Sequence, residues 1–360
     1  MQISNQSDEH LYDHLAGVLL GTALGDALGL FMEGLSAETI ASWFASGIDR
    51  YYLLGNIGFL SDDTEQSALI AQALIRYPND YARCTRAFQI SMLGWFCRLP
   101  FGVGRATSLA CLKMFLGLRE TGIRSAGNGA AMRAAIIGVY FYDDQQRRLQ
   151  FGTSMARVTH VDERAIDGAL FVAELAATAF VGGPIADEDA RYRFFDVALE
   201  VVKESSLRSA LLIARALAAQ KMPMQDAQKQ IGSSGFVNQS VPIAAFAFLR
   251  FGGDSLLAVQ STIMAGGDTD TNAAIVGAWC GALYGEQRLP QSLIEKISAG
   301  PFGPAHLRKL ARALTTSKTG AEASAPGYWW ILALARNLAL LPLIVSHALL
   351  RVCRAGSLRP

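Results

Sequence analysis

Two acidic segments of the chain combine residue types that could hold divalent cations. One reads GFLSDDTE (58–65) and the other AGGDTDTN (265–272), and each leads into a pattern typical of a helix. Serine, threonine and aspartate are preferred helix N-caps, so capping alone would explain either segment. A cap needs one oxygen acceptor, however, and each segment offers several carboxylates and hydroxyls. Oxygen ligands of this kind favour magnesium, manganese or calcium.

The chemistry of these segments depends on whether they meet in the fold. If they do, their carboxylates would repel one another unless cations lay between them. Two adjacent cations can orient substrate oxygens and activate a water molecule, which is the chemistry of binuclear hydrolases. Most of the chain separates the two segments, so their spacing in the sequence does not show that they meet.

Composition restricts the class of protein. Apolar residues make up 51% of the 360 residues and charged residues 18%, which excludes a disordered chain. A net charge of +1 argues against a nucleic-acid partner bound by bulk electrostatics. The 5 cysteines include no CxxC pair, so a disulfide framework or thiolate zinc site is not expected, and a reducing cytoplasmic setting fits. The N-terminal segment has no signal-peptide pattern.

The sequence predicts an all-α fold, because alanine and leucine dominate the apolar positions and strand-like alternation is rare. Glycine or proline clusters separate many of the helices, since glycine suits left-handed caps and proline cannot continue a helix. The predicted helices are Leu11–Leu28, Asp63–Arg76, Arg83–Phe96, Ala130–Phe141, Asp162–Phe180, Ala190–Val202, Leu207–Gln220, Val241–Phe251, Ser255–Met264, Thr271–Tyr284 and Pro290–Ile297.

These helices are predicted to form one compact domain over residues 8–313, since no fixed-period repeat indicates a solenoid. Residues 314–327 (LTTSKTGAEASAPG) are small and polar, and are predicted to be a linker to a hydrophobic tail, residues 328–360. A monomer is the default expectation for the oligomeric state.

Four glycines, Gly17, Gly21, Gly25 and Gly29, lie on one face of the first predicted helix. Each glycine costs up to ~1 kcal/mol in a helix, so four at this spacing indicate a packing requirement. We therefore expect another backbone to approach this face closely.

Several motifs occur in an order that resembles one protein family. They are Gly17-Val18-Leu19-Leu20-Gly21 through Gly25-Asp26-Ala27-Leu28-Gly29 with Glu33, Ser61-Asp62-Asp63-Thr64, Gly127-Asn128-Gly129-Ala130-Ala131-Met132-Arg133, Thr159-His160, Ser240-Val241-Pro242 and Gly266-Gly267-Asp268-Thr269-Asp270-Thr271. One motif alone would be weak evidence, but the ordered set spans roughly residues 14–300. The chain resembles the ADP-ribosylglycohydrolase family, which includes the dinitrogen reductase-activating glycohydrolase and the ADP-ribosylarginine and ADP-ribosylserine hydrolases.

The resemblance implies two magnesium or manganese ions at the base of a cleft in an all-α domain. The implied metal ligands are Ser61, Asp62, Asp63, Asp268, Asp270 and Thr271. Many family members have threonine where this chain has Ser61, and because both supply a hydroxyl oxygen we expect the ligand role to survive. Glu33 and Asp62 are the implied catalytic residues. An unplaced glutamate is by default a solvent-facing loop residue, but the spacing of Glu33 from Asp26 favours function.

The resemblance also implies a pocket for ADP-ribose at Ser125, Gly127, Asn128 and His160. A small glycine-rich turn before a helix suits a diphosphate, because its backbone N–H groups can point at the anion. Some relatives have an aromatic residue at the position of Ala126, so one wall of the pocket differs here. Taken alone, His160 would be interpreted as a cap or surface residue, and Asp26 as a residue that holds the metal ligands in place.

The implied function is metal-dependent removal of ADP-ribose from protein side chains, by hydrolysis of the bond at ribose C1″. Arginine-linked substrates are favoured, with serine and other acceptors left open, and ADP-ribosylated protein and ADP-ribose are the expected partners. The alternatives are a non-catalytic ADP-ribose-binding relative and a hydrolase of another ADP-ribosyl adduct. The presence of all four motif aspartates favours an active enzyme.

The tail opens with YWWILALARNLALLPLIVSHALL (328–350), close to the ~20 residues that span a bilayer. Its first aromatic residues suit a membrane interface, and the arginines from Arg351 onward suit a cytoplasmic end. Arg336 opposes spanning, because a central arginine costs ~2.5–3.5 kcal/mol on insertion scales. Three interpretations stay open: a membrane-associated tail, a helix that covers an apolar groove or partner, and an unstructured end.

Overall fold

Helices build the whole described part of the chain. The computed structural model describes residues 2–45, 47–53, 55–100, 102–183 and 188–342. Within these ranges there are isolated bridges but no strand, which confirms the predicted all-α class. The helices and 3₁₀ turns are α1 (Gln2–Gly29), η1 (Leu30–Met32), α2 (Ala37–Trp43), α3 (Asp62–Arg76), α4 (Tyr81–Phe96), α5 (Arg105–Phe115), η2 (Asn128–Ala130), α6 (Ala135–Tyr140), α7 (Gln145–Arg157), α8 (Glu163–Gly182), α9 (Glu188–Leu199), α10 (Ser205–Ala219), α11 (Met224–Ile231), α12 (Val237–Phe251), α13 (Ser255–Ile263), α14 (Thr269–Tyr284), η3 (Glu286–Arg288), α15 (Gln291–Ile294) and α16 (Pro304–Lys318). A further helix, Trp330–Pro342, is called the tail helix below.

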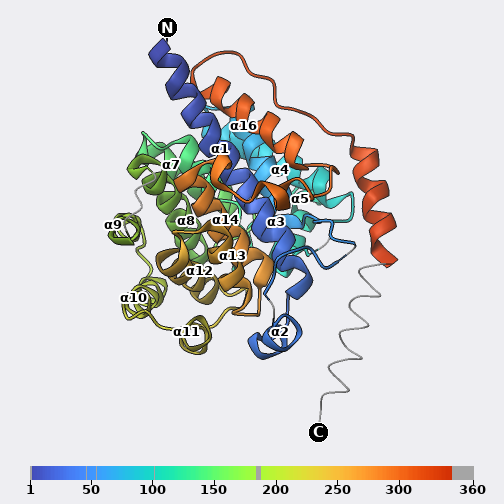
Figure 1. Cartoon of the computed structure of the whole chain (residues 1–360). Helices are drawn as coiled ribbons and strands as arrows, with labels where there is room; N and C mark the ends of the chain where they lie inside the picture. Colours follow the sequence, from blue (N-terminus) through green and yellow to red (C-terminus); the bar gives the residue numbers. More distant parts are fainter. Residues whose placement is uncertain (1, 46, 54, 101, 184–187, 343–360) are drawn as a thin grey trace.

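The antiparallel pair α1 and α14 forms the centre of the molecule (Figure 1). Each of Gly17, Gly21, Gly25 and Gly29 faces the backbone of α14, and a Cβ atom at any of them would overlap one of its carbonyl oxygens. Glycines of α14 face α1 in the same way. The predicted close approach of another backbone to the glycine face is thus confirmed, and the two helices are nearly in backbone contact.

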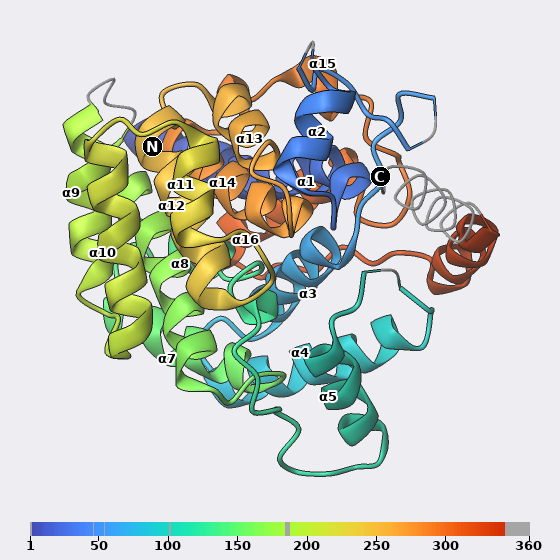
Figure 2. The ribbon, with the colours of Figure 1, turned by 90° about the horizontal axis from the view of Figure 1, so that it is seen from below.

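The other helices pack around this pair in two groups. α3 and α16 lie along α1, while α8, α12 and α13 pack against α14. α9, α10 and α11 cover α8 and α12 at one edge of the molecule, and α4 and α5 form another edge (Figure 2). α14 is buried along its whole length and α3 from Asp62 to Ile75, so both acidic segments begin in the interior.

Several helices differ from the prediction. The sequence does not predict α2, α5, α7, α11 and α16, each of which is short or has a high share of polar residues. The predicted helix Ala130–Phe141 is instead η2 followed by α6. Asn128 explains this break, because its backbone N–H donates to Gly235 and its carbonyl accepts from Ala131 and Met132, which makes a tight turn.

The predicted linker, residues 314–327, starts inside α16. Helix α16 continues to Lys318, because Leu307, Leu310 and Leu314 form one buried stripe and the polar residues after them hydrogen-bond back to the helix. From there the chain runs outside regular helix to the tail helix.

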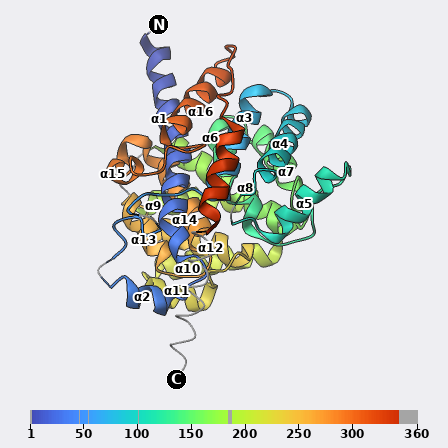
Figure 3. The same cartoon turned by 90° about the vertical axis from the view of Figure 1, so that its right-hand side faces the viewer.

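The tail helix lies on the surface of the domain, over the face shown in Figure 3. Residues 343–350 of the predicted apolar run, and the rest of the tail to residue 360, lie outside the described residues. In the described part, two helices are long and apolar enough to cross a membrane, Gln6–Met32 and Glu163–Gly182. They are 89% and 83% buried inside the domain, so they are accounted for as core helices.

The close contact between α1 and α14 predicts how glycine replacements will behave. Gly21→Ala should lower the free energy of unfolding by about 1–3 kcal/mol, because its Cβ would collide with the Gly277 carbonyl. The matched control is Gly94→Ala in α4, where the added Cβ meets no atom within 4 Å. There the better helix propensity of alanine should leave stability equal or higher by about 0.5–1 kcal/mol. Urea unfolding of both variants checks this, and equal effects would contradict it.

Candidate functional site

Three chain segments meet at the candidate site: the loop after η1 that carries Glu33, the start of α3 and the start of α14. The α1–α14 pair positions each of them. Thr269 at the start of α14 donates its hydroxyl to the Gly29 carbonyl at the end of α1, with an O–O distance of 2.8 Å. The loop after η1 is tied to the same place, because the Gly34 N–H donates to Gly267 (2.7 Å). Glu33 is thereby held beside the first turn of α14.

The first acidic segment forms the N-terminus of α3. Ser61 is the N-cap, and its hydroxyl accepts from the Asp63 N–H at 3.4 Å and lies 3.1 Å from Asp63 Oδ2. Capping therefore accounts for Ser61. Asp62 and Asp63 occupy the first turn, where the helix dipole favours negative charge.

The second acidic segment forms the N-terminus of α14, but its side chains do not cap the helix in the usual way. Asp268 occupies the N-cap position and its side chain makes no capping hydrogen bond. Its Oδ2 instead accepts from Asn128 Nδ2 at 2.8 Å. Simple capping thus does not explain Asp268, since its carboxylate faces the glycine-rich turn at Asn128.

The two acidic segments meet. The Thr271 hydroxyl donates to Asp63 Oδ2 over 3.2 Å, across 208 positions of the chain. A single cavity of about 280 Å³ is lined by residues of both segments and by the predicted ADP-ribose residues. Its predicted site residues are Glu33, Asp62, Ser125, Gly127, Asn128, His160, Asp268, Asp270 and Thr271. Ser61 and Asp63 complete the predicted set from behind the lining, through their hydrogen bonds to one another and to Thr271.

The carboxylates of this cluster repel one another in a buried setting. Burial, followed by repulsion from neighbouring carboxylates, raises the pKa of Asp62, Asp63 and Asp270 well above its ordinary value. Glu33 contributes to this repulsion at Asp62 and Asp270. A divalent cation would relieve the repulsion and restore the charged form.

The candidate metal-ligand atoms of the two acidic segments are carboxylate and hydroxyl oxygens, which suit a hard cation. Asp63 Oδ1 is buried and has no hydrogen-bond partner, so it is an acceptor left for a ligand. In the described part of the chain, no group of three or more His, Cys, Asp and Glu side chains is by itself arranged to hold a metal ion. A metal site here would therefore also need the hydroxyls of Ser61 and Thr271, as the sequence predicts.

Asp26 holds the first acidic segment in place. Its carboxylate is fully buried and accepts from the Ser61 N–H (3.0 Å), the Thr64 N–H (3.2 Å) and the Thr64 hydroxyl (2.5 Å). These bonds satisfy the free N–H groups at the start of α3 from a residue on α1. Burial raises the pKa of Asp26 to about 6, although the hydrogen bonds oppose the increase.

The other side of the cavity is formed by η2 and the end of α7. His160 lies against the glycine-rich turn, since a Cβ at Gly129 would be 3.1 Å from its ring. Its Nδ1 is 2.8 Å from the Thr159 hydroxyl. Burial, with a smaller effect from the Arg133 guanidinium, lowers the pKa of His160 to about 3. The imidazole is therefore neutral near pH 7 and can donate or accept one hydrogen bond on a ligand.

A hydrogen-bond chain links the two sides of the cavity. Gln66 donates to Asp62 Oδ2 (3.0 Å) and accepts from Arg133, which also donates to the Thr159 hydroxyl (2.6 Å). The sequence did not single out Gln66. Its position one helical turn after Asp62 was the available signal, because residues four apart share a face.

The segment before α5 is a second part of the site that the sequence did not identify. Gly102, Gly104 and Thr107 line the cavity, and Gly102 has a φ of +75° beside Asp62, where a Cβ would lie 3.0 Å from Oδ1. From the sequence, no functional role was assigned to this segment. Two glycines immediately before a helix were the signal, since they permit a close approach to a ligand or carboxylate.

Comparison with known proteins identifies the family. The family model for ADP-ribosylglycohydrolase matches residues 7–323. The chain belongs to the ADP-ribosylglycohydrolase family. It is 29% identical over 290 residues to an uncharacterized protein of Archaeoglobus fulgidus, covering 76% of this chain and 88% of that protein. It is 27% identical over 295 residues to ADP-ribosylhydrolase ARH3 of Xenopus tropicalis, covering 71% of this chain and 81% of that protein.

A solved structure shows the same fold. It is described as an ADP-ribosylglycohydrolase-related protein complex and matches with a TM-score of 0.63 at 24% identity, over 86% of this chain and 99% of that chain. The predicted family and enzyme class are confirmed, and the chain is an ADP-ribosylglycohydrolase-family hydrolase. The roles of its individual residues stay predictions.

The buried hydrogen bonds of Asp26 to Ser61 and Thr64 predict that even a conservative substitution of Asp26 will destabilise the protein. Asp26→Asn should lower the free energy of unfolding by about 1–3 kcal/mol, because the amide NH2 would face buried donors. The matched control is Asp80→Asn at the exposed N-cap of α4, where asparagine caps about as well as aspartate. Thermal or urea unfolding measures both. If Asp26→Asn lowers the free energy of unfolding no more than Asp80→Asn does, the hydrogen bonds of Asp26 are not needed for stability.

The environment of His160 predicts its protonation. Its NMR resonances should not titrate between pH 5 and 8, because its pKa is about 3 in the folded protein. The unfolded chain binds this proton at a pKa of about 6.5. The contribution of His160 to stability is therefore complete above that value and is lost as the pH falls from about 6.5 towards 3. His160→Gln assigns the signal, and titration of that signal near neutral pH would contradict the burial.

Proposed function

We propose that this hydrolase removes ADP-ribose from ADP-ribosylated protein side chains, with two magnesium or manganese ions bound by the acidic cluster. The ligands would be Ser61, Asp62, Asp63, Asp268, Asp270 and Thr271. The observation that carries the proposal is the hydrogen bond from Thr271 to Asp63, because it joins the two acidic segments at one cavity.

Three properties of the cluster support bound cations. The candidate ligands are carboxylates and hydroxyls, burial and then mutual repulsion raise the pKa of Asp62, Asp63 and Asp270, and Asp63 Oδ1 lacks a hydrogen-bond partner. The chemistry that such cations supply is to fix vicinal ribose hydroxyls and to lower the pKa of a water molecule. Magnesium and manganese both suit these ligands.

The opposite side of the cavity would bind the ADP-ribosyl group. Ser125, Gly127 and Asn128 line this side of the cavity, where the missing side chain of Gly127 would leave room for a phosphate. Neutral His160 can hydrogen-bond a ribose or phosphate oxygen without the cost of a buried charge. Asn128 is already fixed by its bond to Asp268, so it would hold the substrate and the acidic cluster in register.

Hydrolysis replaces the bond between C1″ and the acceptor atom with a bond to a water oxygen. Glu33 or Asp62 would accept the proton of that water, and the acceptor atom leaves with a proton. Both carboxylates line the cavity. Glu33 is only half-buried, so it can exchange its proton with solvent after each turnover.

The arginine linkage is the first substrate for the test of this proposal. The two cations would balance the four carboxylates that line the cavity beside Arg105, so the charge of the lining does not itself select between a cationic and a neutral acceptor. Serine-linked ADP-ribose is the second substrate for the test. ADP-ribosylated protein and free ADP-ribose are the partners that this reaction requires.

The proposal predicts loss of activity on removal of one metal ligand. Asp62→Asn should lower the release of ADP-ribose by more than about 100-fold, since changes around a metal site outside its ligands already cost about 10–100-fold. The variant should fold, because removing one of several repelling carboxylates relieves strain. The matched control is Asp226→Asn on the surface of α11, where activity should not change.

The assay measures free ADP-ribose released from arginine- and serine-modified protein with magnesium, with manganese and with EDTA. Activity that EDTA removes, from one substrate only, would support the metals and assign the linkage. Full activity of Asp62→Asn, or full activity in EDTA, would reject the metal site. Binding of ADP-ribose without release from either protein would instead support a binding relative or another adduct.

A further inference from the structure

The tail helix exposes a broad apolar face. Ala333 and Asn337 form its buried face, with exposed fractions of 0% and 1%. Its outer face is apolar, and the most exposed residues around it are Trp329 (77%), Ile331 (73%), Leu332 (61%), Leu338 (50%) and Leu341 (46%). A contiguous apolar face of this kind marks a contact with another molecule or with lipid.

Polar side chains attach the tail helix to the domain. Asn337 Nδ2 donates to the Arg98 carbonyl (2.8 Å), and Arg336 donates to Glu65 Oε1 (2.7 Å). Trp330 Nε1 donates to the Gly94 carbonyl of α4 (2.7 Å). Arg336, which opposes a membrane-spanning tail, is therefore one of the residues that bind the tail helix to α3 and its surroundings.

Glu65 makes this attachment strong. It is buried on α3, and its other oxygen accepts from Arg98 (2.8 Å) and Trp95 (2.7 Å). Arg336 is mostly buried as well, with a side-chain exposure of 18%. A charge-assisted bond between buried groups holds one geometry far better than an exposed pair does.

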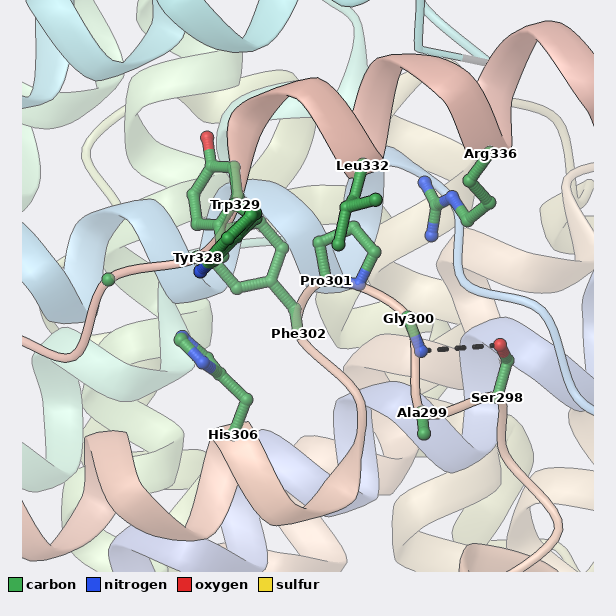
Figure 4. Close-up of a pocket in the computed structure, with 11 residues that line it drawn as sticks. Ser298, Ala299, Gly300, Pro301, Phe302, His306, Tyr328, Trp329, Leu332 and Arg336 are labelled. Carbon is green, nitrogen blue, oxygen red and sulfur yellow. Dashed lines mark hydrogen bonds between the residues drawn. The ribbon is translucent and has the colours of Figure 1, made fainter.

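Apolar packing contributes less to the docking. A cavity of about 470 Å³ lies between the tail helix and the loop from Ser298 to Phe302 (Figure 4). Tyr328, Leu332 and Arg336 line it from the tail side. The tail helix is thus attached by a few hydrogen bonds beside this cavity, and most of its apolar surface faces outward.

The chemistry of the tail selects a lipid surface as the occupant of this face. From residue 323 to the end, the sequence contains four arginines and no aspartate or glutamate. Tryptophans stand at the start of the helix, where they suit the headgroup region. The apolar sequence continues through residues 343–350 and is followed by Arg351, Arg354 and Arg359. Apolar and basic residues together match an anionic leaflet.

We propose that the tail helix is an interfacial membrane anchor that stays docked on the catalytic domain. Its exposed apolar face would enter the headgroup region of an anionic bilayer, while Arg336 and Asn337 keep its inner face on α3 and α4. The helix would lie in the interface rather than span it, because hydrogen bonds from Arg336 and Asn337 hold its inner face on the domain.

This arrangement would hold the candidate site close to the bilayer. Glu65 lies three residues after Asp62 on α3, so the anchor attaches to the helix that carries the acidic cluster. Modified proteins at the same membrane surface would be the substrates it reaches most readily. Membrane binding itself needs only the tail, so it does not depend on the proposed metal chemistry.

The test is sedimentation of the full chain with vesicles of phosphatidylcholine, with and without phosphatidylglycerol. The wild-type protein should bind the anionic vesicles, and more weakly as salt increases. Ile331→Glu/Leu338→Glu should reduce that binding by at least about 10-fold, because charges replace two exposed apolar contacts. Its hydrolase activity and unfolding midpoint should not change.

The matched control is Leu212→Glu/Ile213→Glu on α10, which replaces two apolar residues of similar exposure, 46% and 50%, away from the tail. This variant should bind vesicles as the wild-type protein does. Equal loss in both variants would show general hydrophobic adsorption and would overturn the proposal. Failure of the wild-type protein to bind anionic vesicles would overturn it as well.

A second measurement tests the docked state and a rival occupant. Hydrogen exchange of 330–342 should slow when vesicles are added, and Asn337→Ala should speed exchange there without lowering vesicle binding. If a second copy of this chain covers the face instead, the wild-type protein will be a dimer without lipid and Ile331→Glu/Leu338→Glu a monomer. That result would overturn the membrane anchor and leave the hydrolase assay unaffected.

Discussion

The backbone contact between α1 and α14 is the constraint on which the rest of the structure depends. Glycine carries no Cβ, so the two helices approach until the carbonyls of one face the Cα atoms of the other. Short-range packing of this kind fixes both the distance and the axial register of a helix pair. Asp26 and Glu33, near the end of α1, are thereby placed against the start of α14, and the acidic cluster follows from that register.

The same contact concentrates carboxylates at a cavity where, among the described residues, the lining contains a single guanidinium, that of Arg105. The cluster is kept in place by bonds that belong to its surroundings: Asp26 satisfies the start of α3, and Asn128 fixes Asp268. The repulsion is therefore built into a rigid frame and cannot relax by movement of the helices. A cation would find the carboxylates already close together, because the free-energy cost of placing them there is part of folding. This arrangement favours cation binding.

Helix α3 connects two different environments. Its first turn carries Asp62 and Asp63 towards the cavity, and Glu65 on another face accepts from Arg98 and from Arg336 of the tail helix. A segment outside the compact core is thus joined to the site-bearing helix by buried charged groups. Gln66 and Arg133 continue the polar contacts towards His160, so the interior of this all-helical protein contains a connected hydrogen-bond network.

Apolar periodicity and glycine spacing are local properties of the chain, and they predict the helical class and the close packing of the glycine face. The residues that gather at the cavity follow instead from the resemblance of the ordered motifs to the family. The sequence alone missed Gln66, Gly102 and several short or polar helices, and it could not show that Asp63 meets Thr271. The packing of the helices brings Asp63 and Thr271 together and turns Arg336 and Asn337 towards the domain. The reason is physical: such contacts depend on how helices distant in sequence pack, and no local pattern encodes that geometry.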